Sequence, residues 1–133
     1  MRMIYLVGYS GSTESKSALS LARDHAAGSG AQVIVVASTR GGSKETPEEI
    51  KEKEDNLLYA ENFLKEKNIA CECYQIARGA LPGEDLVSYA EENDVDQIYV
   101  GIEIKSKTQK ILIKSNAQYV ILNAPCPVVT VNR

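Results

Sequence analysis

The sequence has no tryptophan, one phenylalanine, one histidine and only three cysteines among its 133 residues. Cys71, Cys73 and Cys126 are odd in number and lack the spacing of a disulfide framework. Two neighbouring thiols and a single histidine, His25, do not make up a zinc site. We therefore interpret the cysteines as small apolar residues, and we predict no metal site.

Long apolar runs and an excess of basic residues are missing as well. No apolar stretch approaches the roughly 20 residues that a membrane-spanning helix needs. The apolar start of the chain ends in Gly-Tyr-Ser-Gly rather than in a small-residue cleavage site, which argues against a signal peptide. The net charge of −3 argues against nucleic acid or an anionic membrane as a partner. We expect a cytoplasmic protein.

What the sequence does contain is typical of a single α/β domain over residues 1–133. Hydrophobic residues make up 44% of the chain and charged residues 25%, the usual balance of a globular protein. Short apolar segments alternate with segments of helical periodicity. This alternation predicts a Rossmann-like three-layer sandwich, with a five-stranded, mainly parallel sheet and helices on both faces. The predicted strands are Met3–Tyr9, Ala31–Ser38, Ile69–Ala77, Asp96–Gly101 and Cys126–Val131.

Capping residues mark the first two helices. Ser12 or Thr13 can cap the first, and Gly28–Gly30 should end it. Thr46-Pro47-Glu48-Glu49 combines a cap, a first-turn proline and a capping box, and it predicts the start of the second. The second helix should expose a charged face and turn its apolar residues inward, namely Ile50, Leu57, Ala60 and Leu64.

Ligands of such folds bind beyond the carboxyl ends of the strands, where the strand order reverses. The loops that follow the predicted strands are therefore the candidate ligand loops. They are Tyr9–Thr13, Ser38–Thr46, Arg78–Gly83 and Gly101–Lys107.

Two stretches resemble the universal stress protein family: "YLVGYSGSTESKSALSLARDHA" near the start and "DQIYVGIEIKSKTQKILIKSNAQYVILNAPCPVVTV" at the end. The resemblance follows the element order along essentially the whole chain. It implies a Rossmann-like domain that commonly forms homodimers. Many members of the family bind ATP, and others do not.

The resemblance also implies where a nucleotide would lie. Members that bind ATP carry three spaced glycines after the fourth strand, the last followed by serine or threonine. In this chain those glycine positions hold Gly101, Ile104 and Lys114, and the hydroxyl residue is Ser115. The family's aspartate after the first strand is replaced by Ser10.

These replacements weaken the usual phosphate site. Glycine lets backbone N–H groups approach an anion and permits positive φ, which a β-branched residue such as Ile104 disfavours. Lys114 blocks a close backbone approach, although its ammonium group can pair with phosphate. Ser10 cannot accept two hydrogen bonds as a carboxylate does. We predict a degenerate ATP-binding motif, and the residues expected to contact any bound nucleotide, ATP or AMP, are Ser10, Gly101, Ile104, Ser106, Lys114 and Ser115.

Three functions are consistent with the sequence. The favoured one is a regulatory or partner-binding module of the universal stress type that lacks canonical ATP binding. The second is a nucleotide-binding stress-response switch with a modified phosphate loop, and the third, by fold analogy alone, is a slow nucleotide hydrolase or adenylyl-transferring enzyme. We expect no enzyme and no catalytic residue, because Gly8-Tyr9-Ser10-Gly11 does not fit the G-x-S-x-G elbow and His25 lies far down the first helix.

The last predicted strand, "CPVVTV", suggests a homodimer. A strand at a sheet edge leaves backbone groups unpaired, and these can pair with a second copy. Relatives often pair through this strand across a two-fold axis. We expect a homodimer through Val128, Val129, Thr130 and Val131.

Overall fold

The computed structural model describes residues 2–38, 46–76, 81–103 and 115–132. Within these ranges strands and helices alternate, and every strand pair of the sheet is parallel, which confirms the predicted α/β fold. The elements are β1 (Ile4–Gly8), α1 (Thr13–Ser29), β2 (Gln32–Ser38), α2 (Pro47–Lys65), β3 (Cys71–Ile76), α3 (Pro82–Glu92), β4 (Gln97–Ile102), α4 (Ser115–Asn123) and β5 (Val128–Asn132).

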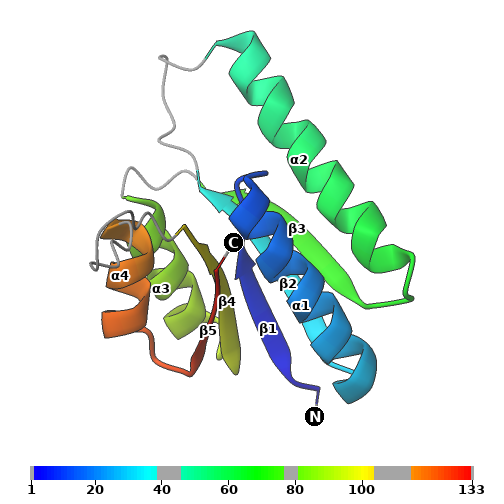
Figure 1. The fold of residues 1–133 in the computed structure, drawn as a ribbon, viewed down its shortest axis with the longest axis vertical. Coiled ribbons are helices and arrows are strands. Elements are labelled where there is room, and N and C mark those ends of the chain that lie inside the picture. Colours follow the sequence, from blue (N-terminus) through cyan, green and yellow to red (C-terminus); the bar gives the residue numbers. More distant parts are fainter. Residues whose placement is uncertain (1, 39–45, 77–80, 104–114, 133) are drawn as a thin grey trace.

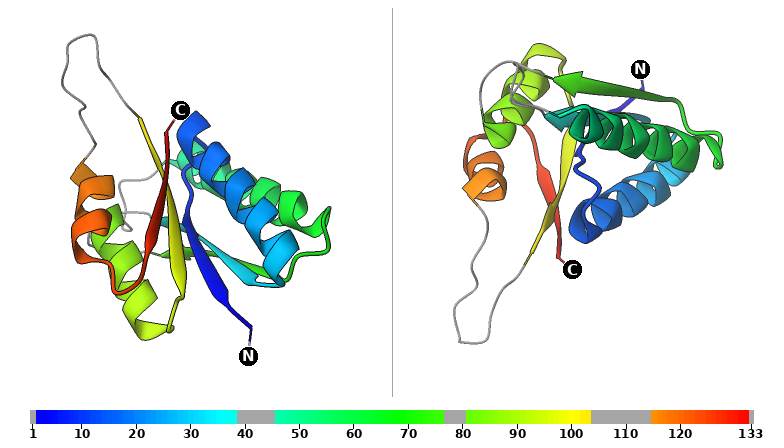
Figure 2. Two further views of the ribbon diagram at one scale, coloured as in Figure 1. Left: turned by 60° about the horizontal axis from the view of Figure 1, so that its bottom comes forward. Right: turned by 90° about the horizontal axis from the view of Figure 1, so that it is seen from above.

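The five strands lie in the order β3-β2-β1-β4-β5 (Figure 1). Helices α1 and α2 cover one face of the sheet, and α3 and α4 cover the other (Figure 2). The chain moves outward from β1 to β3 and then crosses to β4 on the other side of β1. The strand order therefore reverses between β1 and β4, and the carboxyl ends of these two strands are the expected place for a ligand.

Alternate residues of each central strand face the two helical layers. Val7 belongs to the core cluster under α1 and α2, whereas its neighbour Leu6 belongs to the cluster under α3 and α4. In β2 every residue between the first and the last is buried. Such continuous burial is expected of a strand that is covered on both faces.

The predicted helix ends agree with the structure. Ser12 is the N-cap of α1, and its Oγ accepts a hydrogen bond of 3.2 Å from the backbone N–H of Ser15. Gly30 ends the helix with a left-handed φ of 77°, which glycine adopts without strain. Thr46 caps α2 through a bond of 3.2 Å from the N–H of Glu49 to its Oγ1.

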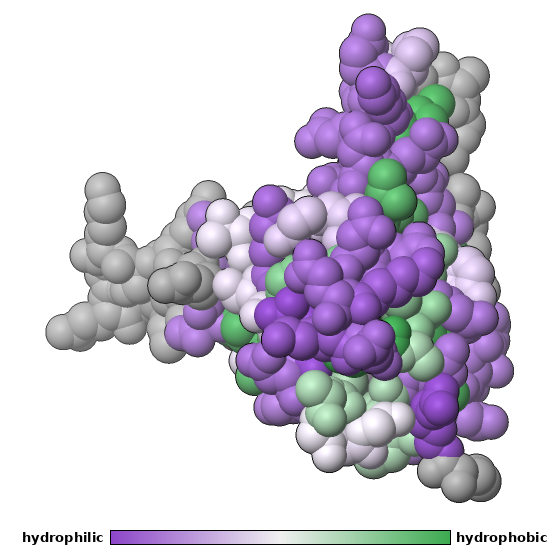
Figure 3. Space-filling view, turned by 90° about the vertical axis from the view of Figure 1, so that its right-hand side faces the viewer, coloured by the Kyte–Doolittle hydropathy of each residue, from purple (hydrophilic) through white to green (hydrophobic). Residues whose placement is uncertain are grey.

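One prediction for α2 is wrong. Ala60 and Leu64 are buried and Leu57 packs against the core, but Ile50 is 42% exposed. The reason is the length of the helix: its N-terminal turns project beyond the sheet (Figure 1), and Ile50 is the fourth residue of the helix. The side of the molecule that carries α2 is mostly hydrophilic, as expected from the charged face of this helix (Figure 3).

None of the helices in the described ranges combines the length and the apolar character that crossing a membrane requires.

Candidate functional site

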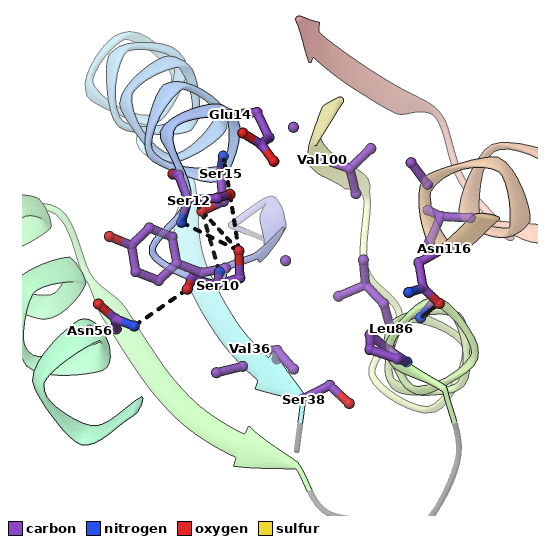
Figure 4. A pocket seen from close by; sticks show the side chains of 18 of the residues that line it. Ser10, Ser12, Glu14, Ser15, Val36, Ser38, Asn56, Leu86, Val100 and Asn116 are labelled. Carbon is purple, nitrogen blue, oxygen red and sulfur yellow. Dashed lines mark hydrogen bonds between the residues drawn. The ribbon is translucent and has the colours of Figure 1, made fainter. Parts of the chain in front are cut away.

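A pocket of about 320 Å³ opens at the point where the strand order reverses. Its walls come from the carboxyl ends of β1, β2 and β4, from the N-terminal parts of α1, α3 and α4, and from Lys53 and Asn56 of α2 (Figure 4). Two ends of different chemistry can be distinguished. One is lined by hydroxyl groups and the first turn of α1, and the other mainly by aliphatic side chains.

Three serines build the polar end. The Ser10 hydroxyl donates to Ser12 Oγ at 3.0 Å, and the backbone N–H of Ser10 donates to Ser15 Oγ at 3.3 Å. The Ser15 hydroxyl in turn donates to the backbone carbonyl of Ser12 at 3.0 Å. These bonds fix the loop that joins β1 to α1. A ligand at this end therefore meets the hydroxyl oxygens of the loop, and the carboxylate of Glu14 in the first turn of α1 lines the pocket beside them (Figure 4).

The same loop is also held by α2. The side-chain amide of Asn56 donates to the backbone carbonyl of Ser10 at 3.4 Å. Gly11 adopts a φ of +83°, and a Cβ at this position would lie 2.7 Å from the Asn56 amide. Glycine at this position therefore permits both the positive φ of the turn and the close approach of the Asn56 side chain. Asn56 lines the pocket, and no pattern in the sequence predicts which residue of α2 reaches this loop.

Close packing against α1 explains why position 101 holds a glycine. A Cβ on Gly101 would lie 2.2 Å from the backbone carbonyl oxygen of Glu14 in the first turn of α1. A side chain would therefore displace this turn. Gly101 lines the pocket, and the absence of its side chain allows the start of α1 to rest on the end of β4.

A second glycine brings the helices of the other layer together. A Cβ on Gly83 would lie 2.6 Å from the backbone oxygen of Asn116, and the N–H of Gly83 donates to Asn116 Oδ1 at 3.2 Å. The first turns of α3 and α4 are thereby joined beside the pocket. Pro82, Gly83 and Asn116 all line the pocket, and the first two belong to the Arg78–Gly83 segment that was predicted as a ligand loop.

The opposite end is apolar. Val36, Leu86, Val100 and Val120 line it, and each also belongs to the core cluster beneath α3 and α4. Ser38 lies at this end, away from Ser12 and Ser15 (Figure 4). An aliphatic wall of this kind suits a flat, uncharged group such as a nucleobase.

Ser38 is paired with a buried acid. Its hydroxyl donates to Asp85 Oδ2 at 2.5 Å, and Asp85 in the first turn of α3 is only 1% exposed. Among the residues that the structure describes, the other carboxyl oxygen of Asp85 has no hydrogen-bond partner. The contact with Ser38 was missed, because it depends on how α3 packs against β2.

The predicted site residues have different outcomes. Ser10 and Gly101 line the pocket. Ser115 is the first residue of α4, next to the lining residue Asn116. Ile104, Ser106 and Lys114 lie outside the residues that the structure describes.

Tyr9 forms part of the pocket wall and is 4% exposed. Within the part of the chain that the structure describes, its hydroxyl has no hydrogen-bond partner. Burial, together with the nearby Tyr59, raises the pKa of Tyr9 to about 12, so its hydroxyl stays neutral at physiological pH.

The chain's histidine and cysteines lie outside this pocket. His25 Nδ1 is hydrogen-bonded to the hydroxyl of Tyr99 at 2.6 Å, in the core layer beneath α1. Cys71 and Cys73 pack against the same layer, as expected of small apolar residues, and burial raises the pKa of the Cys73 thiol to about 12. Within the described ranges, His, Cys, Asp and Glu nowhere gather into a group that could hold a metal ion.

Comparison with known proteins agrees with this architecture. Residues 1–132 match the family described as "Universal stress protein family". A universal stress protein from Archaeoglobus fulgidus is 30% identical, with a TM-score of 0.86 and 98% of each chain covered. A structure of the universal stress protein from the same organism in complex with dAMP is 27% identical, with a TM-score of 0.80 and 98% of each chain covered.

A sequence relative gives a shorter match. A universal stress protein of Methanocaldococcus jannaschii is 38% identical over 53 residues, which is 40% of this chain and 31% of that protein. The family match, in contrast, extends over nearly the whole chain, and the fold and strand order agree with it. This chain therefore belongs to the universal stress protein family.

Proposed function

We propose that the protein is a cytoplasmic, non-catalytic regulatory module whose pocket binds a nucleoside monophosphate such as AMP. We further propose that it does not bind ATP through the glycine pattern of the family. The observation that carries the proposal is the pocket between β1 and β4, which joins an apolar end to a hydroxyl-lined end. A nucleotide has the matching halves, a flat base and a polar sugar phosphate. The related structure in complex with dAMP supports this class of ligand.

The proposed loss of canonical ATP binding rests on three residues. Ile104 and Lys114 occupy positions where ATP-binding relatives have glycine, and Ser10 replaces an aspartate. Without these glycines the backbone N–H groups of the loop are hindered from closing around a triphosphate. A monophosphate depends less on such a cradle, because it presents a single phosphoryl group.

A non-catalytic role is supported by the hydrogen bonds of the candidate nucleophiles. Among the described residues, the hydroxyls of Ser10 and Ser15 donate to other oxygens of the loop between β1 and α1. The chain's histidine, the usual general base beside a serine, is bonded to Tyr99 instead.

Isothermal titration calorimetry of the full chain with AMP, dAMP and ATP, each with and without Mg²⁺, tests the proposal. We expect AMP to bind with a Kd on the order of 1–100 μM, and ATP to bind no more tightly than AMP. Combining Ile104→Gly, Lys114→Gly and Ser10→Asp should tighten ATP binding while leaving AMP binding less affected.

Two results would contradict the proposal in different ways. Wild-type binding of ATP about tenfold more tightly than AMP would show that the altered motif still holds a triphosphate. Failure of all three nucleotides to bind would leave a partner-binding module without a nucleotide as the function.

A further inference from the structure

Lys53 interrupts the apolar face of α2. Leu57, Ala60 and Leu64 form this face and pack into the core layer beneath α1 and α2. Lys53 lies seven residues before Ala60, which is about two helical turns, so both residues belong to the same side of the helix. Lys53 is half-buried, whereas residues 51, 52, 54 and 55 around it are exposed. A lysine therefore stands where the periodicity of the helix predicts an apolar side chain.

The surroundings of this part of α2 account for the exception. One turn after Lys53, the side-chain amide of Asn56 donates to the backbone carbonyl of Ser10 at 3.4 Å. Lys53 and Asn56 both line the pocket. The inward side of α2 therefore lies against the pocket and the loop between β1 and α1 here, and not against the core. A charged side chain at this place can meet a ligand.

Few charged residues line the pocket. Among the lining residues that the structure describes, Lys53 carries the only positive charge and Glu14 the only negative one. Glu14 lies beside the hydroxyls of Ser10 and Ser12 (Figure 4). A phosphate group bound to these hydroxyls would be repelled by the Glu14 carboxylate, because like charges at short range raise the energy of both. An ammonium group close by offsets this repulsion.

The altered glycine pattern makes such a group necessary. Phosphate groups are commonly held by the backbone N–H groups of glycine-rich loops, and here Ile104 and Lys114 occupy two of the expected glycine positions. Lysine is itself a common phosphate ligand, since its compact ammonium group offers three hydrogen atoms at the end of a flexible stem. Lys53 can supply this charge from α2, which is a different element from the loop after β4.

We infer that Lys53 of α2 binds the phosphate group of the nucleoside monophosphate at the polar end of the pocket. The inference rests on the proposed function. It adds that the positive charge for the phosphate comes from the helix beside the loop between β1 and α1, so Lys53 should matter only for ligands that carry a phosphate group.

AMP and adenosine are suitable probes, because they differ only in the phosphate group. Calorimetry on the full chain at pH 7 gives a Kd for each, and the ratio of the two is the readout. For the wild type we expect AMP to bind at least about tenfold more tightly than adenosine. Lys53→Met should lower this ratio to about two or less, by weakening AMP and leaving adenosine unchanged. Lys53→Arg keeps the charge and should retain most of the ratio.

Lys51→Met is the matched control. It removes the same charge from the same helix, but Lys51 is exposed and does not line the pocket. We expect it to leave the ratio unchanged, which separates a contact with the phosphate from the general charge of α2. Methionine has nearly the helix propensity of lysine, so both variants should fold, and circular dichroism checks this. A merely structural role of Lys53 would weaken AMP and adenosine together and leave the ratio as it is.

The outcomes separate this inference from the proposed function. If the wild type prefers AMP and the preference survives in Lys53→Met, the inference is wrong and nucleotide binding stands. A preference that is lost in Lys114→Met but kept in Lys53→Met overturns the inference as well and assigns the phosphate to Lys114. Equal wild-type affinities for AMP and adenosine would show that the phosphate is not recognised, which also overturns it. If the wild type binds neither compound, the proposed function fails and the inference falls with it.

Discussion

At the scale of single residues, two buried tyrosines of this protein differ in how their hydroxyls are satisfied. The hydroxyl of Tyr99 accepts from Gln97 Nε2 at 2.7 Å and bonds to His25 at 2.6 Å, whereas that of Tyr9 has no partner in the described ranges. Burial raises the pKa of both to about 12. They therefore provide a matched pair for mutation to phenylalanine.

We expect the two substitutions to have opposite effects on the free energy of unfolding at pH 7. Tyr9→Phe removes an unpartnered buried hydroxyl and should leave the free energy of unfolding unchanged or raise it by up to about 1 kcal/mol. Tyr99→Phe leaves Gln97 and His25 without their partner and should lower it by about 1–3 kcal/mol. Urea unfolding at pH 7 measures both. A marked loss of stability in Tyr9→Phe would show that its hydroxyl has a partner in solution.

Alkaline pH should change the stability of both variants less than that of the wild type. Between pH 10 and 12 an unfolded tyrosine loses its proton while the folded one, with a pKa of about 12, keeps it. Unfolding then releases a proton, so rising pH favours the unfolded state. Each substitution should make the fall of unfolding free energy with pH shallower above pH 10. An equal slope in wild type and variants would contradict the raised pKa values.

Gly101 gives a prediction about packing. Because a Cβ would lie 2.2 Å from the backbone oxygen of Glu14, Gly101→Ala must displace the first turn of α1. We expect a loss of about 1–3 kcal/mol in unfolding free energy, and weaker AMP binding because the serine loop moves. Gly28→Ala is the control, since a Cβ there meets no atom within 4 Å. Thermal unfolding of both variants is the measurement, and equal stability of the two would refute this account of Gly101.

The sequence predicted some site residues and not others, for physical reasons. Ser10 and Gly101 directly follow strands whose carboxyl ends meet at one edge, so a parallel sheet brings them together. Asn56 and the Ser38–Asp85 pair depend on side-chain approach between elements distant in the chain. Neither periodicity nor capping signals contain that information.

At the scale of elements, local signals predicted the helix starts better than the buried faces. The caps of α1 and α2 are made by a side chain and a backbone N–H three residues apart, so the sequence alone specifies them. Burial of Ile50 would have required the sheet to extend beneath the first turns of α2. The sheet ends before these turns, and a 3.6-residue apolar repeat contains no information about how far the sheet extends.

At the scale of the whole molecule, alternation of strands and helices was sufficient for the fold class, and the reversal of strand order accounts for the pocket. The position of β5 has a further consequence. It is the last strand of the sheet order and pairs with β4 on one side, and within the described residues no other strand covers its second side. We propose that a second copy of the chain pairs there and forms a homodimer through Val128, Val129, Thr130 and Val131.

The ladder between β4 and β5 shows which backbone groups are available for that pairing. Ile98 pairs with Val128, and its N–H donates to the carbonyl of Pro127. Backbone groups of alternate residues point to the same side of a strand. Those of Val129 and Val131 therefore face β4, and those of Val128 and Thr130 point outward to the proposed partner.

Thr130→Pro consequently removes an outward N–H without removing a hydrogen bond to β4. We expect the wild type to sediment as a dimer at about 100 μM and this variant as a monomer, with Thr130→Val remaining a dimer because a β-branched residue preserves both the N–H and the strand. Circular dichroism establishes that each variant is folded. A folded Thr130→Pro chain that remains dimeric would place the interface elsewhere, and a monomeric wild type would exclude the proposed dimer. An open strand edge can join two copies only through the backbone groups that point outward, and Thr130 carries one of them.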